Sequence, residues 1–201
     1  MKTNNIMKKS LMFLAALLLF AGCKSNEQTV MNKDFLTLAT ERYSVRSFSP
    51  TPVSQDNIDL IIKAGQIAPT AVNSQPQMVY VAKSEDVMAK LNEVSPCIYG
   101  APHCFVFCYN DENVAQRGEN GNYGDIDVTI VLTHMMLEAA NLGIGTCIVG
   151  YYDAAKLTEA LELPENMHPV LLMPFGYPSE ISEPSEKHSS YRNFEETVKY
   201  L

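Results

Sequence analysis

The chain has 201 residues, of which 46% are hydrophobic and 19% are charged, and its formal net charge at pH 7 is −8. This composition is typical of one globular domain with enough apolar residues for a sizeable core, which excludes a disordered chain or a repeat array. It also excludes nucleic acid as a partner, because neutralising phosphates requires a basic surface.

Residues 1–22 have the pattern of an export signal. Three lysines come first, a short apolar run follows at 11–20, and Ala-Gly stands before Cys23. The run is too short to favour a membrane-spanning helix. The Ala-Gly-Cys ending resembles the lipobox of bacterial lipoproteins, which implies that Cys23 is lipidated. The protein would then be exported to a bacterial cell envelope and held at the membrane only through this lipid. An ordinary cleaved signal with an incidental cysteine is the alternative.

Residues 23–33 are polar and are expected to form a tether before a single domain at 34–201. The signal holds three lysines and no acid, so the rest of the chain has 12 basic against 23 acidic side chains, a net charge of −11. Such acidity favours solubility.

Four cysteines belong to the domain, and two interpretations of them stay open. No CxxC pair and no Cys/His spacing typical of zinc occurs, so no structural metal is predicted. In an exported protein a disulfide among the four is one interpretation, and small buried apolar side chains are the other. The four are Cys97, Cys104, Cys108 and Cys147.

The domain is expected to begin with a short helix at 34–41 and an extended segment at 43–48. Side chains alternate along an extended segment, so Arg42, Ser44 and Arg46 should lie on one side. Two guanidiniums and a hydroxyl would then converge, an arrangement that suits an anion. Taken alone, the arginines could equally be solvated surface charges.

A second helix is predicted to begin after Ser54, a good N-cap, and to end at Pro69. Its apolar positions repeat with helical spacing, so one face should meet the core. A loop rich in Pro, Thr and Asn follows at 69–76.

The remaining residues alternate between predicted strands and helices. Strands are expected at 78–82, 103–109, 144–150 and 168–175, and helices at 85–94, 125–142, 154–161 and 194–201. The helix at 125–142 is apolar nearly all round, so it should be buried on several sides, inside the domain or against a partner chain. The polar, Gly/Asn-rich stretch at 110–124 predicts a surface loop or a lid. A single α+β or α/β domain with about four strands results.

The protein side chains alone do not indicate a reaction. No strand is followed by GxGxxG, and neither GxxxxGK[ST] nor GxSxG occurs. The histidines have no evident nucleophile partner, and His134 is expected to be a core histidine with its hydrogen bonds satisfied. A cofactor would therefore have to supply the chemistry.

An ordered set of short motifs resembles the nitroreductase family of FMN-dependent oxidoreductases. These motifs are RYSVRSF at 42–48, APTAVNSQP at 68–76, AANLGIGT at 139–146, Leu-Pro at 163–164 and FGYP at 175–178. The resemblance implies an α+β, nitroreductase-like three-layer α/β/α sandwich with a central mixed sheet of about four or five strands. It also implies a homodimer, with helix 125–142 in the dimer core.

The resemblance further implies where FMN binds. Residues Arg42, Tyr43, Ser44 and Arg46 would hold the phosphate or the edge of the flavin ring, and the loop residues Pro69, Thr70, Ala71 and Asn73 would reach the partner subunit's flavin. The backbone of Val149 and Gly150 would lie beside the isoalloxazine ring, and Lys187 or, preferably, Arg192 would complete the phosphate site. No metal and no catalytic side chain is assigned, because the flavin N5 would carry the chemistry.

The implied activity is transfer of electrons from NAD(P)H to a nitroaromatic, a quinone or a similar electron-poor acceptor by a ping-pong mechanism. Export conflicts with this activity, because NAD(P)H is cytosolic. One alternative is therefore a lipid-anchored flavin-binding or interaction module with little turnover. Another is a dehalogenase or a flavin-fragmenting enzyme of the same family.

Overall fold

The computed structural model describes residues 34–201. The predicted export signal at 1–22, the lipidation site Cys23 and the tether at 23–33 lie outside the described residues and stay predictions. Among residues 34–201, no helix combines the length and the apolar composition that a bilayer crossing requires.

Four strands form one sheet in the order β1-β2-β4-β3. They are β1 (Gln77–Ala82), β2 (His103–Asn110), β3 (Gly145–Thr146) and β4 (Met167–Gly176). Each neighbouring pair is antiparallel. A parallel pairing occurs at the sheet edge, where Ser44 forms an isolated bridge with Thr146. The extended segment after the first helix therefore lies beside β3.

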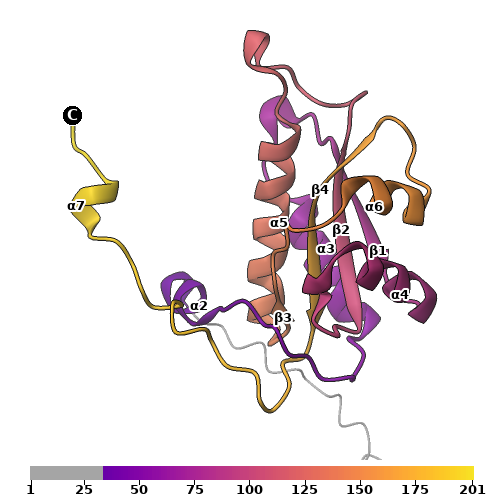
Figure 1. Ribbon diagram of the computed structural model, residues 1–201. Coiled ribbons are helices and arrows are strands. Elements are labelled where there is room, and N and C mark those ends of the chain that lie inside the picture. Colours follow the sequence, from indigo (N-terminus) through magenta and orange to yellow (C-terminus); the bar gives the residue numbers. More distant parts are fainter. Residues whose placement is uncertain (1–33) are drawn as a thin grey trace, which may run out of the picture. The chain divides into compact units, whose positions relative to one another are not determined.

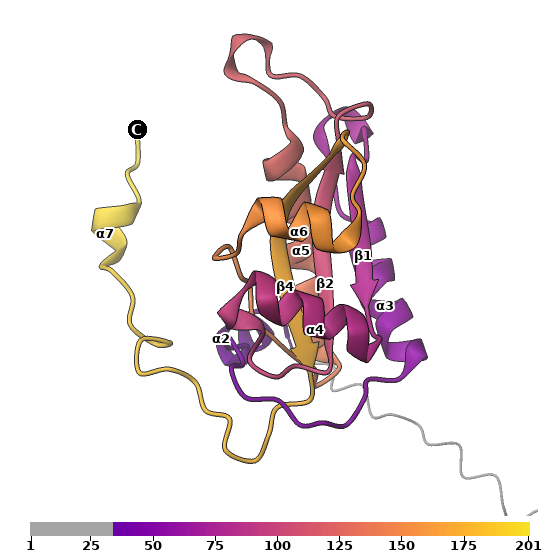
Figure 2. The same cartoon turned by 45° about the vertical axis from the view of Figure 1, so that its right-hand side comes forward.

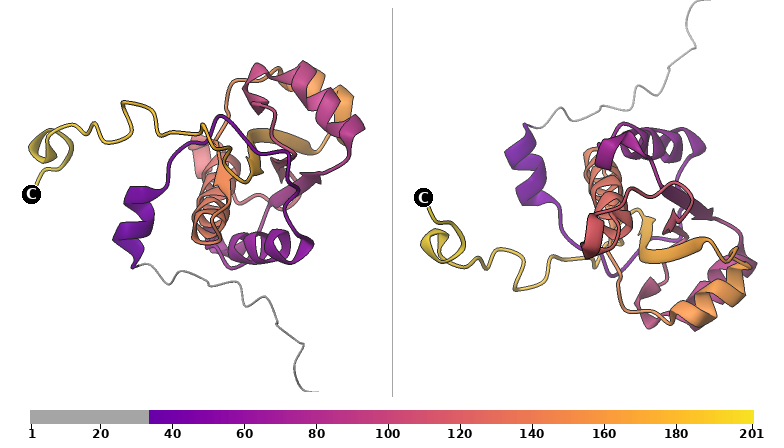
Figure 3. Two further views of the ribbon diagram at one scale, coloured as in Figure 1. Left: turned by 90° about the horizontal axis from the view of Figure 1, so that it is seen from below. Right: turned by 90° about the horizontal axis from the view of Figure 1, so that it is seen from above.

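Helices cover both faces of this sheet (Figures 1 and 2). Helices α3 (Gln55–Gln66) and α5 (Gly124–Asn141) lie on one face, and α4 (Glu85–Val94) and α6 (Ala154–Leu161) lie on the other. The views along the sheet in Figure 3 show the two helix pairs on opposite sides. The predicted three-layer α/β/α fold is confirmed.

The central strand β2 explains why two separate cores form. Successive side chains of a strand point to opposite faces. Phe105 and Phe107 pack with the α3/α5 core, whereas Cys104, Val106 and Cys108 pack with the α4/α6 core. All five side chains are fully buried, so the nearly continuous apolar run of this strand reflects burial on both faces.

Side-chain caps determine where the helices begin. Ser54 Oγ accepts a hydrogen bond from the N–H of Asn57 at the start of α3, and Asp153 Oδ1 accepts one from Lys156 at the start of α6. Asp34 caps α2 (Phe35–Glu41) in the same way. Such caps satisfy backbone donors that the first helical turn leaves unpaired.

Three predicted boundaries are wrong. Helix α3 ends at Gln66 rather than at Pro69, because a proline disfavours helical backbone at the residue before it. Strand β3 covers Gly145–Thr146 instead of 144–150, because its next partner, Pro174, accepts the N–H of Cys147 at 3.2 Å but has no N–H to donate in return. The next bridge is between Val149 and Leu172. Helix α7 is the single turn Phe194–Thr197 instead of 194–201.

Candidate cofactor site

The arginine segment runs along the β3 edge of the sheet. Val45 N–H donates to Thr146 O at 2.9 Å, and the Val45 side chain is buried. Ser44 is half-buried and Arg46 is exposed. The predicted alternation is therefore present: Val45 enters the core, and its polar neighbours lie on the other side.

Gly145 makes this position possible. A Cβ added to Gly145 would lie 2.5 Å from Val45 Cγ2 and 2.9 Å from Val45 Cβ. The β-branched side chain of Val45 cannot avoid this overlap by changing its rotamer, so its backbone would have to move. The missing side chain at Gly145 is thus what lets the arginine segment approach β3.

The two arginines have no acidic partner in the described part of the chain. Neither Arg42 nor Arg46 forms an ion pair with a carboxylate among residues 34–201. The Arg46 guanidinium donates to the carbonyl of Ser44 at 3.2 Å, which holds it close to its own backbone. Both positive charges remain available to an anionic ligand.

The turn after α4 also belongs to this site, which the sequence did not predict. A hydrogen bond with the Cys97 thiol, and then burial, raises the pKa of Tyr99, while a hydrogen bond from Arg46 opposes the shift. Burial raises the pKa of Cys147, and Arg46 and the Ser44 hydroxyl oppose that shift. Arg46 therefore lies close to both Tyr99 and Cys147.

Ser95 ties this turn to the segment that follows Gly150. Its hydroxyl accepts the N–H of Cys97 at 3.1 Å and donates to Tyr151 O at 2.7 Å. The only sequence signal for this arrangement was the pair of turn residues Pro96 and Gly100.

The backbone is held by hydrogen bonds at Val149 and exposed to solvent at Gly150. Val149 exchanges two hydrogen bonds with Leu172, of 2.8 and 2.9 Å, and its side chain is buried. Gly150 is exposed, and an added Cβ would meet only Leu171, at an ordinary 3.6 Å. A planar ligand can therefore approach the Gly150 backbone closely.

The loop at 69–76 lies at the opposite end of α5 from the arginine segment (Figure 1). Ala71 N–H donates to Asp127 in the first turns of α5, whereas the arginine segment bridges Thr146, beyond the last turn. At a rise of 1.5 Å per residue, the helix between Asp127 and Asn141 separates them by about 20 Å. The structure thus does not bring Pro69, Thr70, Ala71 or Asn73 to the arginines of the same chain.

The C-terminal cations are exposed on the tail that follows β4. His188 Nε2 lies 3.0 Å from Thr40 O, and the Tyr43 hydroxyl donates to Ser182 O at 3.3 Å, so the tail passes α2 and the arginine segment. Lys187 stands next to His188, while Arg192 Nε forms an exposed ion pair of 3.2 Å with Glu196. Among residues 34–201, neither cation forms a hydrogen bond with the arginine segment.

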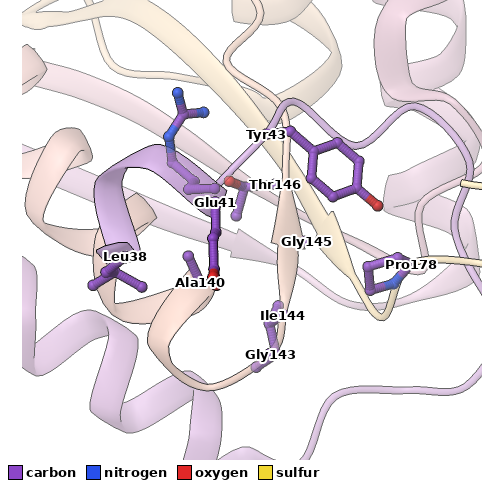
Figure 4. Close-up of a pocket in the computed structure, with 10 residues that line it drawn as sticks. Leu38, Glu41, Tyr43, Ala140, Gly143, Ile144, Gly145, Thr146 and Pro178 are labelled. Carbon is purple, nitrogen blue, oxygen red and sulfur yellow. The ribbon is translucent and has the colours of Figure 1, made fainter. Parts of the chain in front are cut away.

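A small cavity of about 140 Å³ lies beside the arginine segment (Figure 4). It is lined by the end of α2, the α5–β3 turn and Pro178, with Leu38, Tyr43, Ala140 and Ile144 among its walls. Pockets for cofactors usually measure roughly 300–1,000 Å³. This cavity is therefore too small to be the cofactor site within one chain.

Comparison with known proteins identifies the family. The sequence matches the profile of the Nitroreductase family over residues 39–97 and 94–177, which is more than half of the chain. The chain belongs to the nitroreductase family. A relative, "FMN reductase [NAD(P)H]" of Bacillus subtilis (strain 168), is 30% identical over 162 residues, covering 71% of this chain and 65% of the relative. The chain thus spans slightly less than two thirds of that relative.

Two further relatives are similar to this chain over most of its length. An "NADPH-dependent oxidoreductase" of Staphylococcus epidermidis is 29% identical over 168 residues, covering 75% of this chain and 67% of the relative. The crystal structure of a nitroreductase family protein from Clostridium difficile 630 superposes with a TM-score of 0.79 at 33% identity. That superposition covers 84% of this chain and 98% of the other, so the fold of the family is present nearly throughout the described residues.

Proposed function

We propose that this protein is an FMN-dependent oxidoreductase. It would pass electrons from NAD(P)H to an electron-poor acceptor, such as a nitroaromatic or a quinone, by a ping-pong mechanism. The observation that carries the proposal is the extended segment beside β3, which buries Val45 and leaves Ser44 half-buried and Arg46 exposed, with no carboxylate partner for Arg42 or Arg46 in the described chain. The relative named FMN reductase supports the same cofactor.

The residues present fit FMN. Guanidiniums form forked, charge-assisted hydrogen bonds with phosphate or with the oxygen-rich edge of a flavin ring, and the Ser44 hydroxyl adds a donor. The open backbone at Gly150 fits the flat face of the ring. When bound, FMN would supply the redox chemistry by taking a hydride at N5 and passing the electrons on.

The chain's own groups would position the reactants and stabilise charge. Arg46, whose guanidinium donates to the carbonyl of Ser44, would place a positive charge at the ring edge, which would favour the negative charge of a reduced flavin. The two hydrogen bonds between Val149 and Leu172 would keep the backbone that faces the ring from shifting. In the ping-pong order, the oxidised nicotinamide leaves before the acceptor enters over the same face.

A homodimer completes the site in this proposal. The loop at 69–73 lies too far along α5 to cover the arginines of its own chain, so it would cover the flavin held by the partner. Exposed apolar side chains on α2 and the C-terminal tail support the proposal of a second copy, because no other described residue buries them. Their exposed fractions are 66% for Phe35, 74% for Leu36, 82% for Ile181 and 58% for Phe194. We further propose that Lys187 or Arg192 reaches the FMN phosphate in the dimer.

Location in the cell envelope is also part of the proposal, and it rests on the sequence of residues 1–23 alone. Lipidation of Cys23 would anchor the protein, and the electron donor would then have to be available outside the cytosol.

Flavin colour and reduction test the proposed function. The full chain, purified from cells supplied with riboflavin, should be yellow and show the absorbance of oxidised flavin. Adding NADH or NADPH without oxygen should bleach that absorbance. Absence of bound or bindable flavin would overturn the enzyme assignment. Bound flavin that stays oxidised with both nicotinamides would overturn the donor, and would favour a flavin-binding module with little turnover.

A further inference from the structure

A single buried carboxylate holds the loop at 69–76. Asp127 is 1% exposed, and its Oδ1 accepts the N–H of Ala71 at 2.9 Å. Its Oδ2 is buried and has no hydrogen-bond partner among the residues that the structure describes. Burying a carboxylate is costly, so its presence here calls for a role beyond filling space.

The loop requires this hydrogen bond because its backbone is in an unfavourable conformation. Val72, Asn73 and Gln75 all have positive φ, of 48°, 57° and 49°. Left-handed backbone is rare for a β-branched residue such as Val72. The Val72 side chain is 90% exposed, so its own packing cannot maintain this shape.

Two hydrogen bonds to side-chain oxygens reinforce the loop, whose backbone also pairs from Asn73 N–H to Thr70 O and from Ser74 N–H to Ala71 O, each at 3.0 Å. Thr70 Oγ1 accepts the N–H of Gln75 at 3.0 Å, which closes the loop on itself. The bond from Ala71 to Asp127 then attaches the closed loop to α5. Helix α5 also presents Ile126, which is 41% exposed, on the side away from its own core.

We infer that Asp127 is a positioning residue for the cofactor site of the partner subunit. Its hydrogen bond to Ala71 would keep Asn73 and the strained loop backbone beside the first turns of α5, where they would contact the partner's flavin. This inference rests on the proposed function, because it requires FMN and a second copy of the chain. It assigns Asp127 no contact with the flavin itself.

Three substitutions in the full-length chain test the hydrogen bond. In Asp127→Ala the loop loses its attachment to α5, so FMN affinity, measured by quenching of flavin fluorescence, should fall by about tenfold or more. In Ala71→Pro the N–H donor is removed while Asp127 is kept, and proline is tolerated at the first position of a helical turn, so a similar loss is expected. Asp127→Asn keeps an oxygen that can accept the same N–H and should retain most of the affinity.

Asp125→Ala is the matched control. Asp125 lies in the same first turn of α5 but is exposed, so its loss should leave FMN affinity unchanged. Equal FMN affinity of Asp127→Ala, Ala71→Pro and the natural chain would overturn the role of Asp127.

Mixed dimers separate a positioning role from a general loss of structure. A heterodimer of Asp127→Ala with Arg46→Ala, purified through two different tags, has one site with an intact arginine segment and an intact loop. It should bind one FMN with the affinity of the natural protein, although neither variant does so as a homodimer. A heterodimer with two weak sites would overturn action on the partner. If the natural chain binds no FMN, that result overturns both the proposed function and the role of Asp127.

Discussion

Burial decides the chemistry of individual cysteines in this protein. Cys104 and Cys108 lie in β2 with no exposed surface, and burial raises the pKa of each thiol to about 12. All four cysteines of the described chain are free. Cys104 and Cys108 thus act as small apolar side chains of the core, and the disulfide interpretation finds no support among residues 34–201.

Thiol alkylation should reflect this difference in burial. At neutral pH the half-buried Cys97 should react with iodoacetamide first, whereas Cys104 and Cys108 should react only after unfolding, because the thiolate is the reactive form. Mass spectrometry of the alkylated peptides measures the order. Modification of Cys104 in the folded protein would contradict its placement in the core.

The residues of the candidate site differ in how far the sequence could predict them. The alternation of Arg42, Ser44 and Arg46 follows from the period of any extended chain, so it was predictable. Tyr99 and Cys147 lie near Arg46, and Asp127 binds Ala71, through contacts between residues far apart in the sequence, which no local pattern encodes. The family resemblance implies that the backbone of Val149 and Gly150 faces the flavin, which stays a prediction, and it could not show that Ser95 connects this segment to the turn at 96–99.

At the level of elements, close backbone approach joins the arginine segment to the sheet. The Gly145→Ala variant should be destabilised by about 1–3 kcal/mol, because the added methyl would overlap Val45. The variant should also bind FMN more weakly, since the arginine segment must move. Urea unfolding and an FMN titration measure the two effects.

Gly150→Ala is the matched substitution for this prediction. Its methyl would meet only Leu171 at 3.6 Å, so the free energy of unfolding should be unchanged, while FMN binding should weaken because the methyl lies where the ring would approach. A large loss of stability in Gly150→Ala, or none in Gly145→Ala, would contradict the account of this edge.

The start of α3 is tied to the sheet by a buried histidine that should make stability depend on pH. His103 Nε2 accepts the N–H of Val53 at 3.2 Å, which requires a neutral ring, and burial, aided by the charge of Lys83, lowers the His103 pKa below 6.5. A lowered pKa means that the unfolded chain binds more protons. His103 therefore adds stability above pH 6.5 that is lost as the pH falls below that value.

Unfolding by urea at several pH values tests this prediction. The free energy of unfolding should fall below pH 6.5 in the natural protein and fall less steeply in His103→Gln, whose amide oxygen can still accept the N–H of Val53. The other three histidines are present in both proteins. Identical slopes would show that His103 is not the titrating group.

The sequence predicts which helices and strands exist better than it predicts where each one ends. Every predicted helix and strand of the domain is present, because apolar periodicity and caps such as Ser54 and Asp153 are local signals. Strand β3 is short because Pro174 sits on the neighbouring strand, and that pairing could not be known from either segment alone. Helix α7 is only one turn, since its residues bury nothing within the described chain and short helices depend on packing.

At the level of the whole molecule, the proposed cofactor site requires two copies of the chain. Sedimentation equilibrium should show a dimer at micromolar concentration. Removing residues 179–201, which expose Ile181 and Phe194, should weaken the dimer, because their apolar surface would lose its cover on the partner. A chain that stays monomeric while binding FMN with full affinity would contradict the division of the site between two subunits.

The most direct test of the central claim is the FMN affinity of Arg46→Ala. Removing a hydrogen bond to a charged group costs about 1.5–3 kcal/mol, so FMN should bind more weakly by roughly 10- to 150-fold. Arg117→Ala is the control, since Arg117 lies over the ring of Tyr123 in the polar loop and carries the same charge. Saturable FMN binding by the natural chain and the control, with this loss in Arg46→Ala, is the predicted result. Equal affinity in all three proteins would remove the arginine segment from the cofactor site.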